Sequence, residues 1–263
     1  MNTVDVIDAH CHLCTAENPY RYGCEAPVEE LIEQMDLASV DVAVVLAVAT
    51  QSNKKATAQY NDFIARTVEE IPDRLVGFGS VHPADGEKAL EELDRVVDLG
   101  LKGIKLHPLF QHIHCDSPEM DQIAESAAEL DIPLFIHSYF PYMTEEAERL
   151  YNLITAHPDT QFILAHTGGH TFLDFYAYVE MRNTGQDNVY FEVSSLSVMF
   201  RKSPYTEHIK WLIEQMGADR VIFGSNYPRY ELVEALSAFD ELGLSFDDSQ
   251  QILGRTIGEL LKL

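Results

Sequence analysis

The sequence predicts an α/β chain folded as a (β/α)8 barrel, the architecture also called a TIM barrel. Short apolar runs alternate with longer amphipathic stretches, eight of each, from end to end of the 263 residues. The runs are rich in Val, Ile, Leu and Phe without strict alternation, which is typical of parallel strands buried on both faces. The length suits one barrel, so we expect a single domain over residues 1–263.

The apolar runs predict the strands. In order, they are Val4–Ala9, Val42–Ala49, Leu75–Val81, Gly103–His107, Pro133–His137, Gln161–His166, Val189–Val193 and Val221–Ser225. An open, doubly wound sheet is the alternative. It is less favoured because the first run is not followed by a glycine-rich phosphate loop.

Apolar residues at helical spacing predict a helix after each strand. The predicted helices are Pro27–Ser39, Ala56–Glu70, Gly86–Leu99, Glu119–Leu130, Thr144–Ala156, Thr171–Met181, Thr206–Met216 and Glu231–Leu242, with a final helix over Asp248–Leu261. Irregular connections are expected at 15–26, 50–55, 108–118 and 194–203. Each follows a strand, so all four should lie on the catalytic face of a barrel.

Composition excludes several classes of partner. The chain carries 43 acidic and 18 basic residues, a net charge of −25. Nucleic acid and anionic membranes both require basic surfaces, so neither is an expected partner. With no signal sequence or membrane span recognised, we expect a cytoplasmic protein. The four cysteines are too few for a disulfide framework in a chain of this size.

The first strand ends in two histidines one residue apart, His10 and His12. Residues i and i+2 of a strand project from the same face, so both imidazoles can aim at one point. Neutral imidazole is the commonest metal ligand in proteins. Cys11 lies between them and should point to the opposite face.

Polar residues recur at the ends of the later strands, and in a barrel these ends form one ring. They are His82, Lys105, His107, His137, His166, Glu192 and Asn226. His82 and His107, each followed by proline, can instead be loop caps. His10, His12 and His137 can supply the three nitrogens of a catalytic zinc site, with a position left for water.

At this point the sequence resembles the amidohydrolase superfamily, in particular its branch of amidohydrolase-2-type hydrolases and decarboxylases. The resemblance covers nearly the whole chain. The motifs that carry it are Ile7-Asp8-Ala9-His10-Cys11-His12, Gly103-Ile104-Lys105-Leu106-His107-Pro108, Leu134-Phe135-Ile136-His137-Ser138, Leu164-Ala165-His166-Thr167-Gly168-Gly169, Val221-Ile222-Phe223-Gly224-Ser225-Asn226-Tyr227-Pro228 and Ile252-Leu253-Gly254.

The resemblance implies a distorted barrel of the amidohydrolase type. It implies one divalent metal, zinc or alternatively manganese, on His10, His12 and His137, with His166 as the acid and base beside it. The family usually has Asp at the end of strand 8, where it binds the metal and accepts a proton from the attacking water. This chain has Asn226 there. An amide oxygen can still bind a metal, but it carries no charge and accepts no proton as a carboxylate does.

We expect further residues to contact the substrate. Lys105 can offer its charge to an anionic substrate or make a structural ion pair, and Glu192 can bond substrate or pair with Lys105. Arg229, like Arg201, can bind a carboxylate as a fork or pair at the surface. Tyr139, directly after the strand-5 motif, is expected to wall the pocket.

These features predict a metal-dependent hydrolase or decarboxylase. It would act through metal-activated water on a small, carboxylate-bearing molecule, by amide, ester or lactone hydrolysis or by decarboxylation. The alternative is a barrel that binds a small molecule or metal without turnover, which Asn226 would explain. A TatD-like nuclease ranks last because of the acidic charge. A homodimer is the default assembly.

Overall fold

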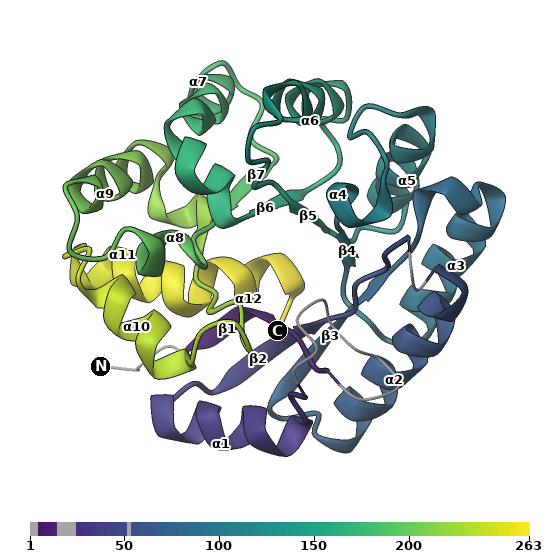
Figure 1. Cartoon of the computed structure of the whole chain (residues 1–263), viewed down its shortest axis with the longest axis horizontal. Helices are drawn as coiled ribbons and strands as arrows, with labels where there is room; N and C mark the ends of the chain where they lie inside the picture. Colours follow the sequence, from purple (N-terminus) through teal and green to yellow (C-terminus); the bar gives the residue numbers. More distant parts are fainter. Residues whose placement is uncertain (1–4, 15–24, 52–53) are drawn as a thin grey trace.

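The computed structural model describes residues 5–14, 25–51 and 54–263, and over these residues the chain forms a parallel eight-stranded barrel (Figure 1). Each strand pairs with the next along the chain. The strands are β1 (Ile7–Cys11), β2 (Val42–Leu46), β3 (Leu75–Ser80), β4 (Ile104–Leu106), β5 (Leu134–His137), β6 (Phe162–Ala165), β7 (Val189–Glu192) and β8 (Val221–Ile222). The predicted fold class is therefore confirmed.

The helices form a ring outside the strands (Figure 1). The α-helices are α1 (Val28–Ala38), α2 (Thr57–Glu70), α3 (Glu87–Asp98), α4 (Pro108–Gln111), α5 (Pro118–Glu129), α6 (Thr144–Ala156), α7 (Tyr176–Asn183), α8 (Leu196–Met199), α9 (Tyr205–Met216), α10 (Leu232–Asp240), α11 (Phe246–Gln250) and α12 (Thr256–Leu261). Shorter 3-10 segments connect several of them.

Four predictions of local structure need correction. Residues 171–181 do not form one α-helix. The irregular 3-10 segment His166–Phe175, which has positive φ at Thr167, Gly168 and Gly169, extends to Phe175, and α7 begins only at Tyr176. The final helix is interrupted by a π-helical turn at Gln251–Arg255. The expected irregular segments 108–118 and 194–203 contain α4 and α8. Most of the predicted 15–26 connection, together with residues 52–53, lies outside the described residues.

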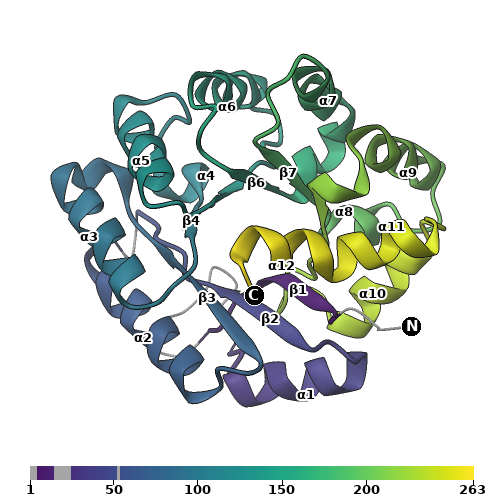
Figure 2. The ribbon, with the colours of Figure 1, turned by 180° about the vertical axis from the view of Figure 1, so that it is seen from behind.

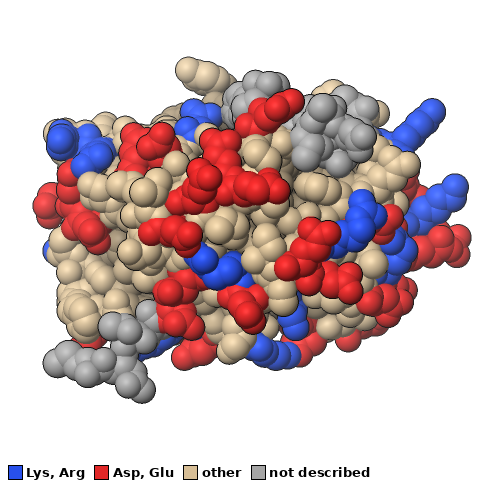
Figure 3. All heavy atoms as spheres, turned by 90° about the horizontal axis from the view of Figure 1, so that it is seen from below, with Lys and Arg blue, Asp and Glu red and all other residues tan. Residues whose placement is uncertain are grey.

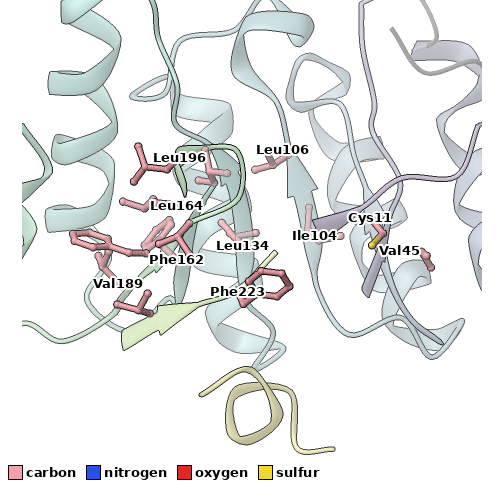
Figure 4. Packing of buried hydrophobic residues seen from close by; sticks show 14 of the residues in the cluster. Cys11, Val45, Ile104, Leu106, Leu134, Phe162, Leu164, Val189, Leu196 and Phe223 are labelled. Atoms are coloured by element: carbon pink, nitrogen blue, oxygen red, sulfur yellow. The ribbon is translucent and has the colours of Figure 1, made fainter. Parts of the chain in front are cut away.

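Apolar side chains fill two layers. The outer layer lies between strands and helices, where Leu134, Leu164 and Phe162 pack with helix residues (Figure 4). The inner layer fills the barrel itself with the alternate residues of the same strands, including Phe135 and Ile163. This alternation is what a sheet covered on both faces requires.

The C-terminal segment covers one end of the barrel. Ile257 and Leu261 of α12 join the inner apolar cluster, and Figure 2 shows α12 lying across β1. The loops that follow the strands, at the opposite end, are left to form the site.

The barrel closes between β1 and the segment after β8. The amide of Ala9 donates to Phe223 O (3.1 Å), and that of His12 donates to Tyr227 O (2.8 Å). Buried Asp8 accepts hydrogen bonds from the amides of His10 and Ser225 through one carboxylate oxygen. These bonds tie the first and last strands together without a long β8.

The surface is strongly acidic, as the charge predicts. On the face shown in Figure 3, Asp and Glu outnumber Lys and Arg. Among the described residues, no helix is both long enough and apolar enough to cross a membrane.

Gly103, directly before β4, tests the packing of the barrel wall. A Cβ there would lie 2.5 Å from the Phe78 ring and 2.8 Å from the carbonyl oxygen of Pro133, which is backbone and cannot turn away. Gly103→Ala should therefore lower the free energy of unfolding by about 1–3 kcal/mol, measured by urea denaturation.

Gly258 is the matched control. A Cβ on this helical glycine meets only Ile7, at 3.8 Å. Gly258→Ala should leave stability unchanged or raise it by up to about 1 kcal/mol. Equal losses for both variants would contradict the packing described here.

Candidate metal centre and active site

A β-bulge in β1 brings His10 and His12 to the inside of the barrel. Between Asp8 and Cys11 the strand has one residue more than the facing stretch of β2, so the register shifts. Ile7 and Ala9 belong to the inner apolar layer, whereas Cys11 belongs to the outer one. The extra residue therefore turns both histidines inward, as bulges beside active sites often do.

The two imidazoles meet edge to edge. His10 Nε2 lies 3.1 Å from His12 Nε2. Two nitrogens that each lie about 2.1 Å from a shared metal ion would be separated by a distance of this size. Both side chains are almost fully buried.

Hydrogen bonds on the other ring nitrogens fix the tautomers. His12 Nδ1 lies 3.2 Å from Leu46 O, a carbonyl that can only accept, so Nδ1 carries the proton. His10 Nδ1 lies 3.0 Å from Glu192 Oε2 and likewise donates. Both Nε2 atoms then present lone pairs to each other, which a cation between them would relieve. Metal-binding histidines commonly donate their other N–H to a carboxylate or carbonyl in this way, so these residues fit a divalent metal.

Glu192, at the end of β7, is fully enclosed. Its Oε2 accepts from His10 Nδ1, from the amide of His166 (3.1 Å) and from the hydroxyl of Ser194 (2.8 Å), while Oε1 accepts from the amide of Ser194 (2.7 Å). Space for it depends on Gly224, where a Cβ would lie 2.5 Å from Oε1. Glu192 was predicted to contact substrate, but it lies behind His10 and not on the cavity wall.

Within the described residues, His10, His166 and Glu192 also bring possible ligand atoms within 4.8 Å of one another. The hydroxyl of Ser194 lies among them, 2.9 Å from His166 Nδ1 and 3.2 Å from His10 Nδ1. The Ser194 hydroxyl hydrogen-bonds to His10, His166 and Glu192. These side chains therefore form a hydrogen-bond network that needs no metal ion between them. The Nε2 side of His10 is therefore the better metal position.

His137 reaches the same end of the barrel from β5. Its ring lies 5.1 Å from that of His166, between centroids, but its Nε2 lies 2.8 Å from Tyr139 O. His137 can serve as the third ligand through Nδ1, or through Nε2 after the ring turns. It stacks on His107 (3.8 Å), which stacks in turn on Phe110 (3.6 Å).

A cavity of about 190 Å³ opens beside these histidines. Its walls come from five strand-end loops and are formed by His107, Leu109, Phe110, His137, Tyr139, Pro141, His166, Ser195, Met199, Asn226 and Arg229. Asn226 has left-handed backbone (φ 64°), and its amide nitrogen donates to Ser195 Oγ at 2.9 Å. The predicted pocket residues Tyr139 and Arg229 thus line one cavity with His166.

Lys105 lies inside the barrel, beneath the site. Its Nζ lies 4.2 Å from the centre of the Phe135 ring, and no described residue hydrogen-bonds it. Burial lowers the pKa of Lys105 to about 7, with Glu192 acting in the opposite sense. Burial raises the pKa of Glu192. An enclosed ammonium of this kind favours an anion in the site.

The imidazoles are held in their neutral, metal-binding form. Burial lowers the pKa of His12 to about 3, and it also lowers the pKa values of His10 and His166, where neighbouring cationic groups add to the effect. Neutral imidazole is required both for a ligand and for a base.

Other predicted residues lie elsewhere. Arg201 pairs with Glu241 on the surface. His107 caps α4 by accepting from Phe110 N, as the loop-cap interpretation predicted. The same interpretation is wrong for His82, whose side chain makes no capping hydrogen bond with the described residues. Sequence reasoning missed Ser194 and Ser195. They follow the strand-7 carboxylate by two and three residues, but serines after a strand are common and give no distinct signal.

The sequence is similar to several known proteins. A family model described as amidohydrolase matches residues 7–263. The chain is 26% identical over 260 residues to 2-amino-3-carboxymuconate-6-semialdehyde decarboxylase of Dictyostelium discoideum, covering 80% of this chain and 71% of that protein. It is 24% identical over 280 residues to gamma-resorcylate decarboxylase of Polaromonas sp. strain JS666, covering 89% and 85%.

The fold is also similar to solved structures. One is 5-carboxyvanillate decarboxylase of Novosphingobium aromaticivorans complexed with manganese and 4-hydroxy-3-methoxy-5-nitrobenzoic acid. The TM-score is 0.78 at 19% identity, covering 99% of this chain and 96% of that one.

Stability of the metal-free protein should fall as pH drops below about 6.5. The folded-state pKa values of His10, His12, His107 and His166 are lowered. Below pH 6.5 these histidines therefore bind protons in the unfolded chain but stay neutral in the folded chain, which lowers the free energy of unfolding. Asp8, with its pKa raised to about 6, and Glu192 oppose this. The unfolded chain then binds about two protons more than the folded chain. The free energy of unfolding should therefore fall by roughly 2–3 kcal/mol per pH unit between pH 6 and 5.

Urea midpoints at pH 7, 6 and 5 measure this dependence. His166→Gln should reduce the slope by about one proton. A midpoint that stays constant or rises on acidification would show that these imidazoles are not buried in neutral form.

Proposed function

Because the chain belongs to the amidohydrolase family, we propose that it is a metal-dependent decarboxylase of a small aromatic or conjugated carboxylic acid. The observation that carries the proposal is the 3.1 Å approach of two unprotonated Nε2 atoms, on His10 and His12, beside a cavity lined by His166 and Arg229. The matched relatives are decarboxylases, so a barrel without turnover finds no support.

His10 and His12 would hold the metal, with His137 as third ligand and the amide oxygen of Asn226 as a neutral fourth. Zinc suits nitrogen ligands, and manganese is the ion held by a related structure. Bound there, a divalent ion would supply Lewis-acid stabilisation of negative charge on the substrate.

The cavity suits a small planar anion. Arg229 lines its wall and can bind a carboxylate with its guanidinium, while the buried charge of Lys105 favours an anion from below. Tyr139, Phe110 and Met199 supply apolar and aromatic surface on which a conjugated ring can pack.

His166 would handle the proton. Its Nδ1 donates to Ser194, so Nε2 can take up a proton and deliver it to the carbon that bears the carboxylate. The bond between that carbon and the carboxylate breaks, its electron pair stays with the ring carbon, and CO2 leaves. The added proton replaces the carboxylate, so charge and atoms balance.

Asn226 favours decarboxylation over hydrolysis. Hydrolysis needs a base next to the attacking water, and an amide cannot act as one. Loss of CO2 requires instead a proton at carbon, which His166 can provide.

The metal ligands can be tested by replacing His12. His12→Ala should abolish stoichiometric binding of Zn²⁺ or Mn²⁺, because it removes one of the two facing nitrogens. His208→Ala changes an exposed histidine on α9 and is the matched control. Elemental analysis after metal loading measures both, and equal metal content in the two variants would refute this ligand assignment.

The reaction can be tested by CO2 release from 2,6-dihydroxybenzoate and 5-carboxyvanillate, beside ester and lactone substrates. We expect the metal-loaded protein to decarboxylate acids of this class and to leave the esters intact. Ester hydrolysis without decarboxylation in the unmodified protein would favour the hydrolase instead.

Asn226→Asp should tighten metal binding about tenfold or more, because it adds a charged ligand.

A further inference from the structure

Two histidines of the site share one hydroxyl group. Ser194, two residues after the end of β7, is fully buried, and its Oγ lies 2.9 Å from His166 Nδ1 and 3.2 Å from His10 Nδ1. The same oxygen lies 2.8 Å from Glu192 Oε2. A metal-ligand candidate and the proton-transfer candidate are thus joined through a single side chain.

The direction of each hydrogen bond follows from the chemistry of the partners. A serine hydroxyl has one proton to donate, and the Glu192 carboxylate can only accept it. The Ser194 oxygen is then an acceptor for both rings. His166 Nδ1 also lies 3.3 Å from the carbonyl oxygen of Ser194, a second group that can only accept. Nδ1 must therefore carry the proton on His166 as well as on His10.

We propose that Ser194 is a positioning residue that, together with Glu192, sets the tautomers of His10 and His166 at the same time. With both Nδ1 atoms protonated, both Nε2 atoms keep their lone pairs, one to bind the metal and the other to take up the proton that His166 delivers to the substrate. The roles of His10 as a metal ligand and of His166 as the proton carrier rest on the proposed function. The tautomers themselves are properties of the folded chain.

The arrangement gives the site a carboxylate that does not depend on strand 8. Asn226 donates to Ser195 Oγ and provides no charge. Glu192 supplies one from β7, and it reaches His166 through Ser194 as well as through the backbone amide of His166. A triad in which a carboxylate orients a histidine works by the same principle.

Nuclear magnetic resonance of the zinc-loaded full chain, labelled with 15N histidine, tests the proposal. The His166 signals are assigned by their loss in His166→Gln. In the unmodified protein, His166 should show a protonated Nδ1 and an unprotonated Nε2. Ser194→Ala should shift His166 toward the Nε2-protonated form. It should also weaken zinc binding, and lower kcat for any acid that is turned over, by about 10- to 100-fold.

Two further variants separate positioning from folding. Ser80→Ala removes a buried serine hydroxyl at the end of β3, where it bonds the Lys105 carbonyl and the Ala49 amide. It should leave the His166 signals unchanged. Ser194→Thr keeps the hydroxyl that Ser194→Ala removes. This variant should therefore show the same Nδ1-protonated His166 signals as the unmodified protein. Should threonine not fit, as thermal unfolding would reveal, Glu192→Gln takes its place. Glu192→Gln should disturb His10 and His166 together, because an amide NH2 would face donors.

The outcomes are distinguishable from those of the proposed function. If His166 follows the predicted pattern but no acid is decarboxylated, the positioning role stands and the proposed reaction fails. If acids are decarboxylated but Ser194→Ala leaves His166 protonated at Nδ1, the carbonyl of Ser194 suffices and the positioning role is overturned. An Nε2-protonated His166 in the unmodified protein would also overturn it.

Discussion

The site depends on the enclosed carboxylate of Glu192. Hydrogen-bond donors from β1, from the start of the 3-10 segment after β6 and from the loop after β7 converge on its two oxygens. A buried carboxylate is tolerated only when its oxygens are satisfied, and leaving its donors unpaired would cost free energy at each. The positions of His10, His166 and Ser194 are therefore linked, and Gly224 is small because the carboxylate needs the space.

The second constraint is the way the barrel closes. β8 is only two residues long, so β1 is held mainly by the segment that follows it and by Asp8. The bulge in β1 turns His10 and His12 inward at this seam. The bulge thus lies in the strand at which the barrel closes, and it creates the pair of facing nitrogens.

Much of the fold could be predicted because its signals are local. The strand-length apolar runs predicted the order of all eight strands, and barrel topology then placed His10, His137, His166 and Asn226 at one end. The bulge could not be predicted, because it exists only relative to the register of β2. The ring orientation of His137 depends on the carbonyl of Tyr139, a contact that spacing does not encode.

The role of Glu192 in the site also could not be predicted from the sequence alone. Its place at a strand end predicted proximity to the histidines, but its role depends on what surrounds it. Ser194 carried no signal of its own, since serines after strands are common. Its role depends on three partners, His10, His166 and Glu192, which only the folded chain brings together around its hydroxyl.

The proposed site is built on His10 Nε2 and His12 Nε2, which lie 3.1 Å apart and would share one divalent metal. Anomalous X-ray diffraction from a crystal grown with Zn²⁺ or Mn²⁺ tests it directly. We expect one strong peak about 2.1 Å from both Nε2 atoms, with His10 Nδ1 still bonded to Glu192. A peak among Glu192, His166 and His10 Nδ1, or no peak at the histidines, would contradict it.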